Sequence, residues 1–303
     1  MHYTFHQLRV FLEVVKQQSI TKAAEEMHMT QPALSIQLKN FQAQFDVPLT
    51  GMSGRQLFVT DFGKEIALLA DKLLEDANAI EYRTKAYEGL VAGKLKISSA
   101  STGKYVMPYF LSGFMQEHRG IDLSLDVTNK SRVLESMREN EVDFALVSVL
   151  PEMLEIEEET LLDNHLYMVG ASREEESDKP MIFRETGSAT RKAMDEYLEK
   201  KQIRKPMELT SNEAVKQAVI AGLGYSVIPL IGIHNELMNE QLYIYERPGL
   251  PIITKWRLIW LKNKLLSPAA TAYLNYVRGH KDQIISEKFG WVKKYVRETS
   301  LQP

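Results

Sequence analysis

Residues 19–35 read Ser19-Ile-Thr-Lys-Ala-Ala-Glu-Glu-Met-His-Met-Thr-Gln-Pro-Ala-Leu-Ser35, and the architecture of the N-terminal part follows from them. Apolar residues recur there at helical spacing, at Ile20, Ala23, Ala24 and Met27. Ser19 stands directly before them, where a side-chain oxygen can accept a hydrogen bond from a free amide of the first turn. The pattern predicts a short helix that begins after Ser19.

A second helix is predicted to follow a tight turn. Thr30 can cap it, and Pro32 falls in its first turn, where a missing amide hydrogen costs nothing. Its apolar side is expected to comprise Ala33, Leu34, Leu38 and Phe41 or Phe45. The residues expected to face outward are Gln31, Ser35, Gln37, Lys39 and Asn40. Two short helices crossing at a turn, the second with a polar outer face, form the helix-turn-helix that fits the major groove of DNA.

The flanking segments predict a small winged domain. Residues 3–18 read as a helix whose apolar stripe consists of Leu8, Phe11, Leu12 and Val15. Residues 47–60 contain Pro48, Gly51 and Gly54 and then Gln56-Leu-Phe-Val-Thr60, which is typical of a turn and a short strand. This segment is interpreted as a wing with Arg55 at its tip.

The motifs of this region resemble those of the N-terminal domain of LysR-type transcriptional regulators. The matching residues are Phe5-His-Gln-Leu-Arg-Val-Phe-Leu-Glu-Val-Val15, Ala23-Ala24, Thr30-Gln-Pro-Ala-Leu-Ser35, Gln37-Leu38, Val47-Pro48-Leu49 and Gly54-Arg55. Two positions depart from the family pattern, since Ile36 stands where many members carry Arg and Thr50-Gly51-Met52 replaces a usual Phe-Glu-Arg. The resemblance implies that DNA is contacted by Thr30, Gln31, Pro32, Ser35, Gln37, Lys39 and Arg55. For Arg55 the alternative is an ordinary solvated loop residue.

Length and composition point to a globular protein of two or three domains. The chain has 303 residues, of which 44% are hydrophobic and 25% charged, and it has no cysteine. Disulfides, thiolate nucleophiles and cysteine-based zinc sites are therefore excluded. No export signal and no apolar run long enough to span a bilayer is evident, so a cytoplasmic location is expected.

Charge gives DNA binding little support by itself. The net charge is -3, and residues 1–60 carry five Lys or Arg against four acids. The DNA-binding prediction thus depends on motif and geometry, with helix N-termini and polar side chains making many of the phosphate contacts.

Enzyme activity is not expected. The seven His residues are scattered without paired acids, and neither a Gly-x-Ser-x-Gly elbow nor a phosphate loop is present. Gly222-Leu-Gly224 follows a predicted helix and precedes a strand, so helix capping explains it better than nucleotide binding. No metal, cofactor or catalytic residue is predicted.

Residues 61–89 predict a long linker helix. Its apolar residues Phe62, Ile66, Leu69, Leu73, Ile80 and Tyr87 fall on steps of four, three, four, seven and seven, which is a heptad seam. A seam on an otherwise charged helix needs a partner, and the resemblance implies that the partner is the same helix of a second copy. The alternative is packing against the chain's own C-terminal domain.

From residue 90 the pattern changes to alternating strands and helices, which predicts a parallel sheet covered on both faces. The predicted fold class is therefore α/β with an N-terminal all-α winged helix-turn-helix, and the resemblance implies a C-terminal periplasmic-binding-protein-like pair of α/β subdomains. The expected divisions are residues 1–60 for DNA binding, 61–89 for the linker, 90–162 and 266–303 for subdomain I with the tail, and 163–265 for subdomain II.

Four predicted strands end in polar loops that lead into helices: 98–103, 128–131, 185–190 and 210–212. Free amides and hydroxyls at helix starts bind small anions, and ligands of open sheets lie at the carboxyl ends of strands. The predicted effector-binding residues are Ser101, Thr102, Thr128, Ser188 and Asn212. The alternative is that each residue only caps its helix. Arg132 and Arg191 lie near two of these helix starts and are candidates to neutralise an anion.

Residues 281–303 are interpreted as an amphipathic tail, with an apolar side formed by Ile284, Ile285, Phe289, Val292 and Val296. The sequence leaves open whether this tail packs on its own subdomain or on another subunit.

The resemblance and these patterns together predict a LysR-type regulator that binds double-stranded DNA and a small anionic metabolite. The resemblance also implies self-association into dimers and a homotetramer on an interrupted palindrome. Residues 35–41, 182–188 and 190–191 look most like regulators of carbon-fixation or sulfur-assimilation operons. The alternatives are an effector-independent architectural DNA-binding protein, and a solute-binding protein or enzyme built on the C-terminal domain alone.

Overall fold

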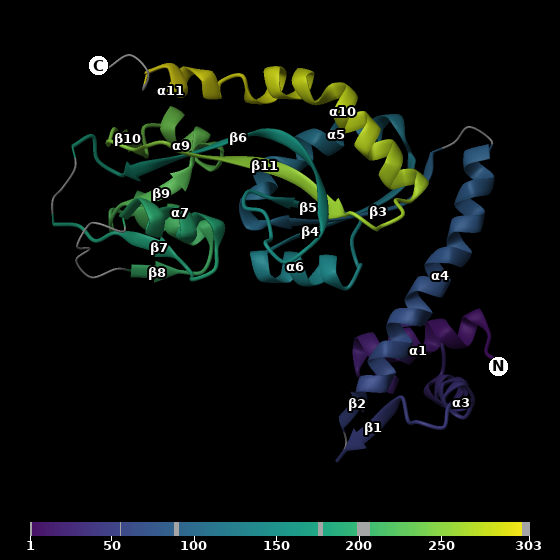
Figure 1. The fold of residues 1–303 in the computed structure, drawn as a ribbon. Coiled ribbons are helices and arrows are strands. Elements are labelled where there is room, and N and C mark those ends of the chain that lie inside the picture. Colours follow the sequence, from purple (N-terminus) through teal and green to yellow (C-terminus); the bar gives the residue numbers. More distant parts are fainter. Residues whose placement is uncertain (1, 55, 88–90, 175–177, 199–206, 299–303) are drawn as a thin grey trace. The chain divides into compact units, whose positions relative to one another are not determined.

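A computed structural model describes residues 2–54, 56–87, 91–174, 178–198 and 207–298. The chain divides into an N-terminal unit, Met1–Glu88, and a C-terminal unit, Gly89–Pro303. Figure 1 shows helices dominating the first unit and a long sheet with covering helices in the second.

The N-terminal unit is a winged helix-turn-helix. Its elements are α1 (Phe5–Gln17), α2 (Ile20–Glu26), α3 (Gln31–Gln42), β1 (Thr50–Ser53), β2 (Gln56–Val59) and α4 (Asp61–Tyr87). The predicted caps are confirmed, since the side chains of Ser19 and Thr30 accept hydrogen bonds of 3.4 Å from the amides of Lys22 and Ala33. Strands β1 and β2 pair antiparallel and form the wing.

Aromatic side chains fix α3 against α1. Phe41 is fully buried, and its ring centroid lies 5.1 Å from those of both Phe11 and Phe45. Leu34 and Leu38 are buried on the same side of α3, as predicted. The assignment of Ala33 to the apolar side was wrong, because Ala33 is exposed on the outer side of the helix.

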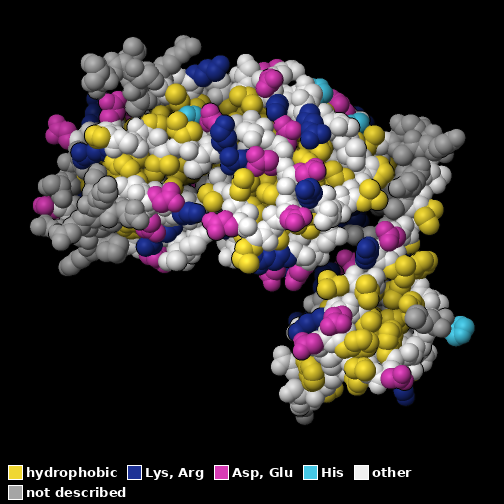
Figure 2. Space-filling model, viewed as in Figure 1, with side chains coloured by type: hydrophobic (Ala, Val, Ile, Leu, Met, Phe, Trp, Pro, Cys, Tyr) yellow, Lys and Arg dark blue, Asp and Glu magenta, His cyan; other side chains and the backbone are white. Residues whose placement is uncertain are grey.

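Helix α4 serves two purposes along its length, so the prediction of a single seam was wrong. Phe62 and Ile66 pack against the core of the N-terminal unit. Leu69, Leu73 and Ile80 are exposed, with 65% of Leu69 accessible to solvent. Figure 2 shows hydrophobic side chains gathered along this unit. The side chain of Tyr87 and residues 88–90 lie outside the described residues.

The C-terminal unit is built on a seven-stranded sheet of order β10-β6-β11-β5-β3-β4, with β9 also pairing with β6. The strands are β3 (Ala92–Ala100), β4 (Gly120–Thr128), β5 (Phe144–Val147), β6 (Ile156–Gly170), β9 (Ser226–Pro229), β10 (Tyr243–Tyr245) and β11 (Ile252–Leu261). The α/β class is confirmed, but the sheet is mixed. Within this sheet, as described, β3 pairs parallel with β4 and β5, whereas β11 pairs antiparallel with both β5 and β6.

The sequence missed the first half of β6, which begins at Ile156 instead of Leu166. Three consecutive acids, Glu157 to Glu159, hide the strand because they do not alternate with apolar residues. Their backbone nevertheless pairs with β11, from Ile156 opposite Leu261 onward.

Helices and a small second sheet complete the unit. The helices are η1 (Ser101–Tyr105), α5 (Met107–Glu117), α6 (Lys130–Arg138), α7 (Ala189–Leu198), α8 (Asn212–Ile220), η2 (Leu230–Gly232) and α9 (His234–Met238). Strands β7 (Ile182–Arg184) and β8 (Met207–Leu209) pair parallel. Gly222 follows α8 with a φ of 76°, as expected of a glycine that ends a helix.

The described part of the tail, residues 281–298, packs on its own chain. Helices α10 (Pro268–Phe289) and α11 (Val292–Glu298) run along one side of the unit (Figure 1). Phe289 is buried in the cluster formed by β3, α5 and α10, and the Trp291 ring stacks on His234 with centroids 3.8 Å apart. The tail therefore joins two hydrophobic clusters of the unit. Within the described ranges no helix is long and apolar enough to cross a membrane.

Candidate functional site

The outer face of α3 is the first candidate site. Gln31, Pro32 and Lys39 are exposed, and Ser35 and Gln37 are partly exposed. Among the described residues, the polar side chains of this set make no hydrogen bond to the protein, so their donors and acceptors are available to a partner. Thr30 differs because its hydroxyl caps α3. Arg55 lies outside the described residues, and its predicted DNA contact remains a prediction.

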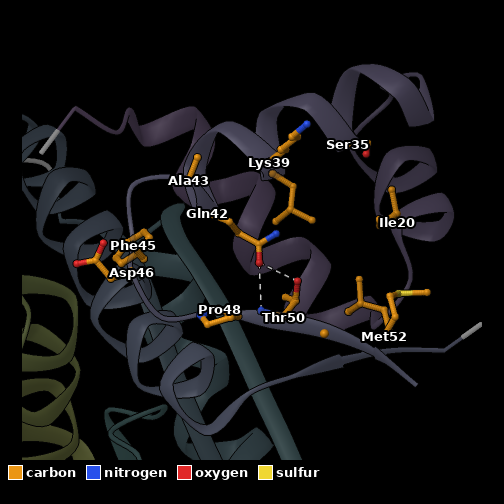
Figure 3. Close-up of a pocket in the computed structure, with 13 residues that line it drawn as sticks. Ile20, Ser35, Lys39, Gln42, Ala43, Phe45, Asp46, Pro48, Thr50 and Met52 are labelled. Carbon is orange, nitrogen blue, oxygen red and sulfur yellow. Dashed lines mark hydrogen bonds between the residues drawn. The ribbon is translucent and has the colours of Figure 1, made fainter. Parts of the chain in front are cut away.

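A groove of about 460 Å³ separates α3 from the wing. Ser35 and Lys39 of α3 and Met52 of β1 are among the residues that line it (Figure 3). The Oε1 atom of Gln42 accepts hydrogen bonds from the backbone amide and the hydroxyl of Thr50, at 3.1 and 2.8 Å. These bonds, drawn in Figure 3, hold the wing at a fixed distance from α3.

A polar cavity in the C-terminal unit is the second candidate site. It lies where β3, β5 and β7 end and where α6, α7 and α8 begin, and its volume is about 30 Å³. Four of the predicted effector residues line it together: Ser101, Thr102, Ser188 and Asn212. Thr128, the last residue of β4, is not among the lining residues, whereas the next residue, Asn129, is.

Hydrogen bonds within the protein show which of the cavity residues cap a helix and which do not. Ser188 accepts a bond of 3.1 Å from the Arg191 amide, which is a cap of α7. Asn212 is not a cap, because Ser211 caps α8. Its Nδ2 atom instead donates to the Ser101 hydroxyl at 3.0 Å, which ties α8 to the loop after β3. The capping alternative therefore fits Ser188 and does not fit Asn212.

Lys130, which is partly exposed, and the buried Arg184 are the cations that line the cavity, and the sequence analysis missed Arg184. Its side chain is only 4% exposed, and its Nε and Nη2 atoms donate to the two carboxylate oxygens of Glu185 at 2.7 Å each. A buried guanidinium needs such a partner. The available signal was its position, since Arg184 ends the predicted strand directly before the polar loop 185–190.

The two arginines that were predicted to neutralise an anion are engaged elsewhere. Arg132 pairs with Glu135 and Glu141 at 3.0 and 2.8 Å. Arg191 pairs with Asp195 and Glu208 at 2.8 and 2.9 Å. Neither arginine lines the cavity.

A charged cluster lies beside the cavity and joins η1, α8 and α9. The Tyr105 hydroxyl donates to Glu213 at 3.0 Å, and the Lys216 ammonium contacts Glu213 and Glu236 at 3.2 and 2.7 Å. Burial raises the pKa of Tyr105 to about 12, so this hydroxyl keeps its proton. Burial also raises the pKa of Glu213, but hydrogen bonds from Gln217, Lys216 and Tyr105 outweigh burial and lower it to about 2.

The described part of the chain holds no group of three or more His, Asp or Glu side chains suited to a metal ion. The two candidate sites offer hydrogen-bonding side chains on α3, and hydrogen-bonding side chains plus a buried cation in the cavity.

Comparison with known proteins agrees with two separate binding sites, one in each unit of the chain. A family model for a bacterial regulatory helix-turn-helix protein of the LysR family matches residues 5–64, and one for a LysR substrate binding domain matches residues 88–282. The chain is 35% identical over 290 residues to a RuBisCO operon transcriptional regulator of Allochromatium vinosum, which covers 91% of this chain and 96% of that protein. It is 32% identical over 294 residues to the transcriptional activator CmpR of Synechocystis, covering 93% and 97%.

A solved structure resembles the C-terminal unit. The CcmR regulatory domain of Synechocystis in complex with 2-PG shares 30% sequence identity with a TM-score of 0.58. The match covers 62% of this chain and 97% of that domain.

Proposed function

The chain belongs to the LysR family of bacterial transcriptional regulators, and from that premise we propose that α3 reads operator DNA while the cavity around Arg184 senses a small anionic metabolite. Because a relative is named as a regulator of a RuBisCO operon, we propose carbon-fixation genes as the targets of this protein. As a bacterial DNA-binding regulator, the protein is proposed to work in the cytoplasm, where the DNA is located. The observation that carries the sensing proposal is the buried Arg184 at the carboxyl ends of the strands.

The DNA-reading proposal is supported by the free polar face of α3. Gln37 can form two hydrogen bonds with adenine, and Ser35 and Lys39 can donate to base edges or phosphates. The Gln42–Thr50 bonds position the wing beside the helix. Phosphate contacts by polar side chains and helix N-termini suit a domain with little excess positive charge.

The sensing proposal assigns the Arg184 guanidinium to the anion. In this structure the Glu185 carboxylate accepts from Nε and Nη2 of Arg184, a bidentate arrangement that the carboxylate or phosphate of a metabolite would also take. We infer that the metabolite displaces Glu185. A cavity of about 30 Å³ holds about one water molecule, so the surrounding loops must move apart for the metabolite to enter. That movement separates Asn212 from Ser101 and gives ligand binding a structural consequence.

The ligand class follows from the same residues and from the relative that binds 2-PG. One buried cation and several hydroxyl and amide donors suit a small molecule with two anionic ends, such as 2-phosphoglycolate. A neutral sugar would leave Arg184 without a charge partner if it displaced Glu185.

Self-association is proposed through α4. Leu69, Leu73 and Ile80 lie exposed on a single helix, and the same helix of a second copy would cover them. Pairs of such chains would place two α3 helices on a palindromic site.

Two measurements on the full-length protein test the proposal. Binding to the DNA upstream of its own gene, compared with random DNA at raised salt, is expected to keep a clear preference. Adding 2-phosphoglycolate is expected to raise the melting temperature by mass action, with glycolate as the singly charged control. Loss of all sequence preference would contradict the DNA-reading proposal. Equal effects of 2-phosphoglycolate and glycolate would contradict a ligand with two anionic ends.

The architectural alternative receives no support. It requires sequence-independent binding and a strongly basic surface, whereas residues 1–60 have nearly balanced charge. The relatives are named as transcriptional regulators or activators.

A further inference from the structure

The outer face of α3 contains an apolar patch. Ile36 is 58% exposed, although its helix neighbours Leu34 and Leu38 are buried. An α-helix turns about 100° per residue, so Ile36 lies about 200° around the axis from Leu34. The side chain therefore points away from the domain core, and the core cluster does not include it.

Two further residues extend the patch. Pro32 and Ala33 precede Ile36 by four and three positions, which places all three on one side of the helix, and both are exposed. Exposed polar residues flank the patch at Gln31, Lys39 and Asn40. A branched apolar side chain thus occupies the centre of a surface that is otherwise suited to hydrogen bonding.

The chemistry of the major groove limits what such a side chain can contact favourably. Base edges present donors and acceptors there, and the prominent apolar group is the C5-methyl of thymine. Isoleucine has no donor or acceptor, so packing it on a polar base edge would remove water from that edge without replacing the hydrogen bond. Packing it on a thymine methyl removes apolar surface of both groups from water.

The position in the helix fits base contact. In helix-turn-helix proteins the N-terminal part of the second helix approaches the base edges. Ile36 is the sixth of the twelve residues of α3, and the patch begins at the second. We propose that Ile36, supported by Pro32 and Ala33, packs on the C5-methyl of a thymine in each half-site and makes that base pair part of the recognised sequence. This inference rests on the proposed DNA-reading role of α3.

Deoxyuridine substitution tests the proposal directly. Deoxyuridine pairs like thymidine and lacks only the C5-methyl. Each thymine in the footprint of the full-length protein on its own upstream DNA is replaced in turn, and the dissociation constant is measured. Replacing one particular thymine in each half-site by deoxyuridine is expected to weaken wild-type binding about four-fold. This loss corresponds to the free energy of burying one methyl group. With Ile36→Ala that replacement is expected to change binding by less than two-fold.

Two further variants serve as controls. Ile36→Val keeps a branched apolar end and is expected to retain most of the methyl dependence. Asn40→Ala changes an exposed residue of the same helix and is expected to retain all of it. Circular dichroism is expected to show unchanged folding for Ile36→Ala, because the residue is exposed. If that variant unfolds, Ile36→Gln replaces it, since Gln suits a helix and lacks the branched apolar end.

The outcomes distinguish this inference from the proposed function. If the wild type prefers its upstream DNA and no thymine is methyl-dependent, or the same thymine stays methyl-dependent in Ile36→Ala, the role of Ile36 is refuted and DNA reading by α3 stands. If the wild type has no preference over random DNA, the proposed function fails and the inference fails with it.

Discussion

The two candidate sites differ in how they use their polar side chains. On α3 the buried side holds the helix in place, and the polar side chains proposed to read DNA make no hydrogen bond to other described residues. Around the cavity, Ser188 caps α7, Asn212 joins Ser101, and Arg184 pairs with Glu185. Stability and binding are therefore separable on α3 and coupled at the cavity. Coupling suits a sensor, because a ligand that replaces internal bonds must also move the elements that those bonds join.

Phe41→Ala is expected to produce the largest loss of stability. Removing a fully buried ring that contacts Phe11 and Phe45 costs about 3–5 kcal/mol of unfolding free energy. Chemical denaturation of the full-length chain measures this loss. Asn40→Ala at an exposed position of the same helix is the control and should stay within about 0.5 kcal/mol of the wild type. A similar cost for both variants would mean that the two sides of α3 are not separable.

Arg184→Ala is expected to weaken both stability and ligand binding. Loss of a bidentate charged contact lowers the affinity for 2-phosphoglycolate roughly 100-fold, or about 3 kcal/mol. The half-buried Glu185 is left without its partner, so the melting temperature falls as well. Calorimetric titration and thermal unfolding measure the two effects. Arg132→Ala removes an arginine that does not line the cavity and should change neither by much. Unchanged affinity in Arg184→Ala would refute the role of this residue.

Gln37→Ala is expected to affect recognition alone. Loss of its base contact reduces discrimination at one or two base pairs by about 1–3 kcal/mol, while thermal unfolding stays unchanged. Competition binding with single-base-pair variants of the site measures the discrimination. The same footprint and affinity as the wild type would show that Gln37 does not read a base.

The sequence was most informative where a local pattern determines the structure. Ser19, Thr30 and Pro32 specify helix starts by their own chemistry, and the structure has helices beginning there. Four of the five effector candidates line one cavity because the end of β3 in the large sheet and the ends of β7 and β8 in the small sheet lead into it. The role of Arg184 was missed, since a charged residue at the end of a strand carries no signal of its burial. Only the folded structure shows that Arg184 pairs with Glu185, and that Arg132 and Arg191 pair with other acids.

The sequence failed to predict two other features for a different reason: the first half of β6, and the division of the apolar residues of α4 into packed and exposed ones. Glu157 to Glu159 pair through backbone atoms, which side-chain periodicity does not report. On α4 the heptad pattern identified apolar positions correctly but did not reveal which partner covers each one. Phe62 and Ile66 pack on their own domain, whereas Leu69 and Leu73 remain exposed.

The smallest expected effect concerns Glu213, whose hydrogen bond from Tyr105 links α8 to η1 beside the cavity. Its pKa of about 2 lies below the ordinary value of 4.5, so its contribution is fully present above pH 4.5 and is lost as the pH falls toward 2. Because 43% of the side chain is exposed, solvent screening limits the contribution to about 1 kcal/mol or less. Glu213→Gln should therefore be less stable than the wild type at pH 7, and the difference should shrink between pH 5 and pH 3. Urea unfolding of both proteins across this range measures the difference, which would stay constant if Glu213 contributed only through packing. A shrinking difference would show that the charge of Glu213 stabilises the fold beside the cavity. No polar side chain on the outer face of α3 is expected to make such a contribution to stability.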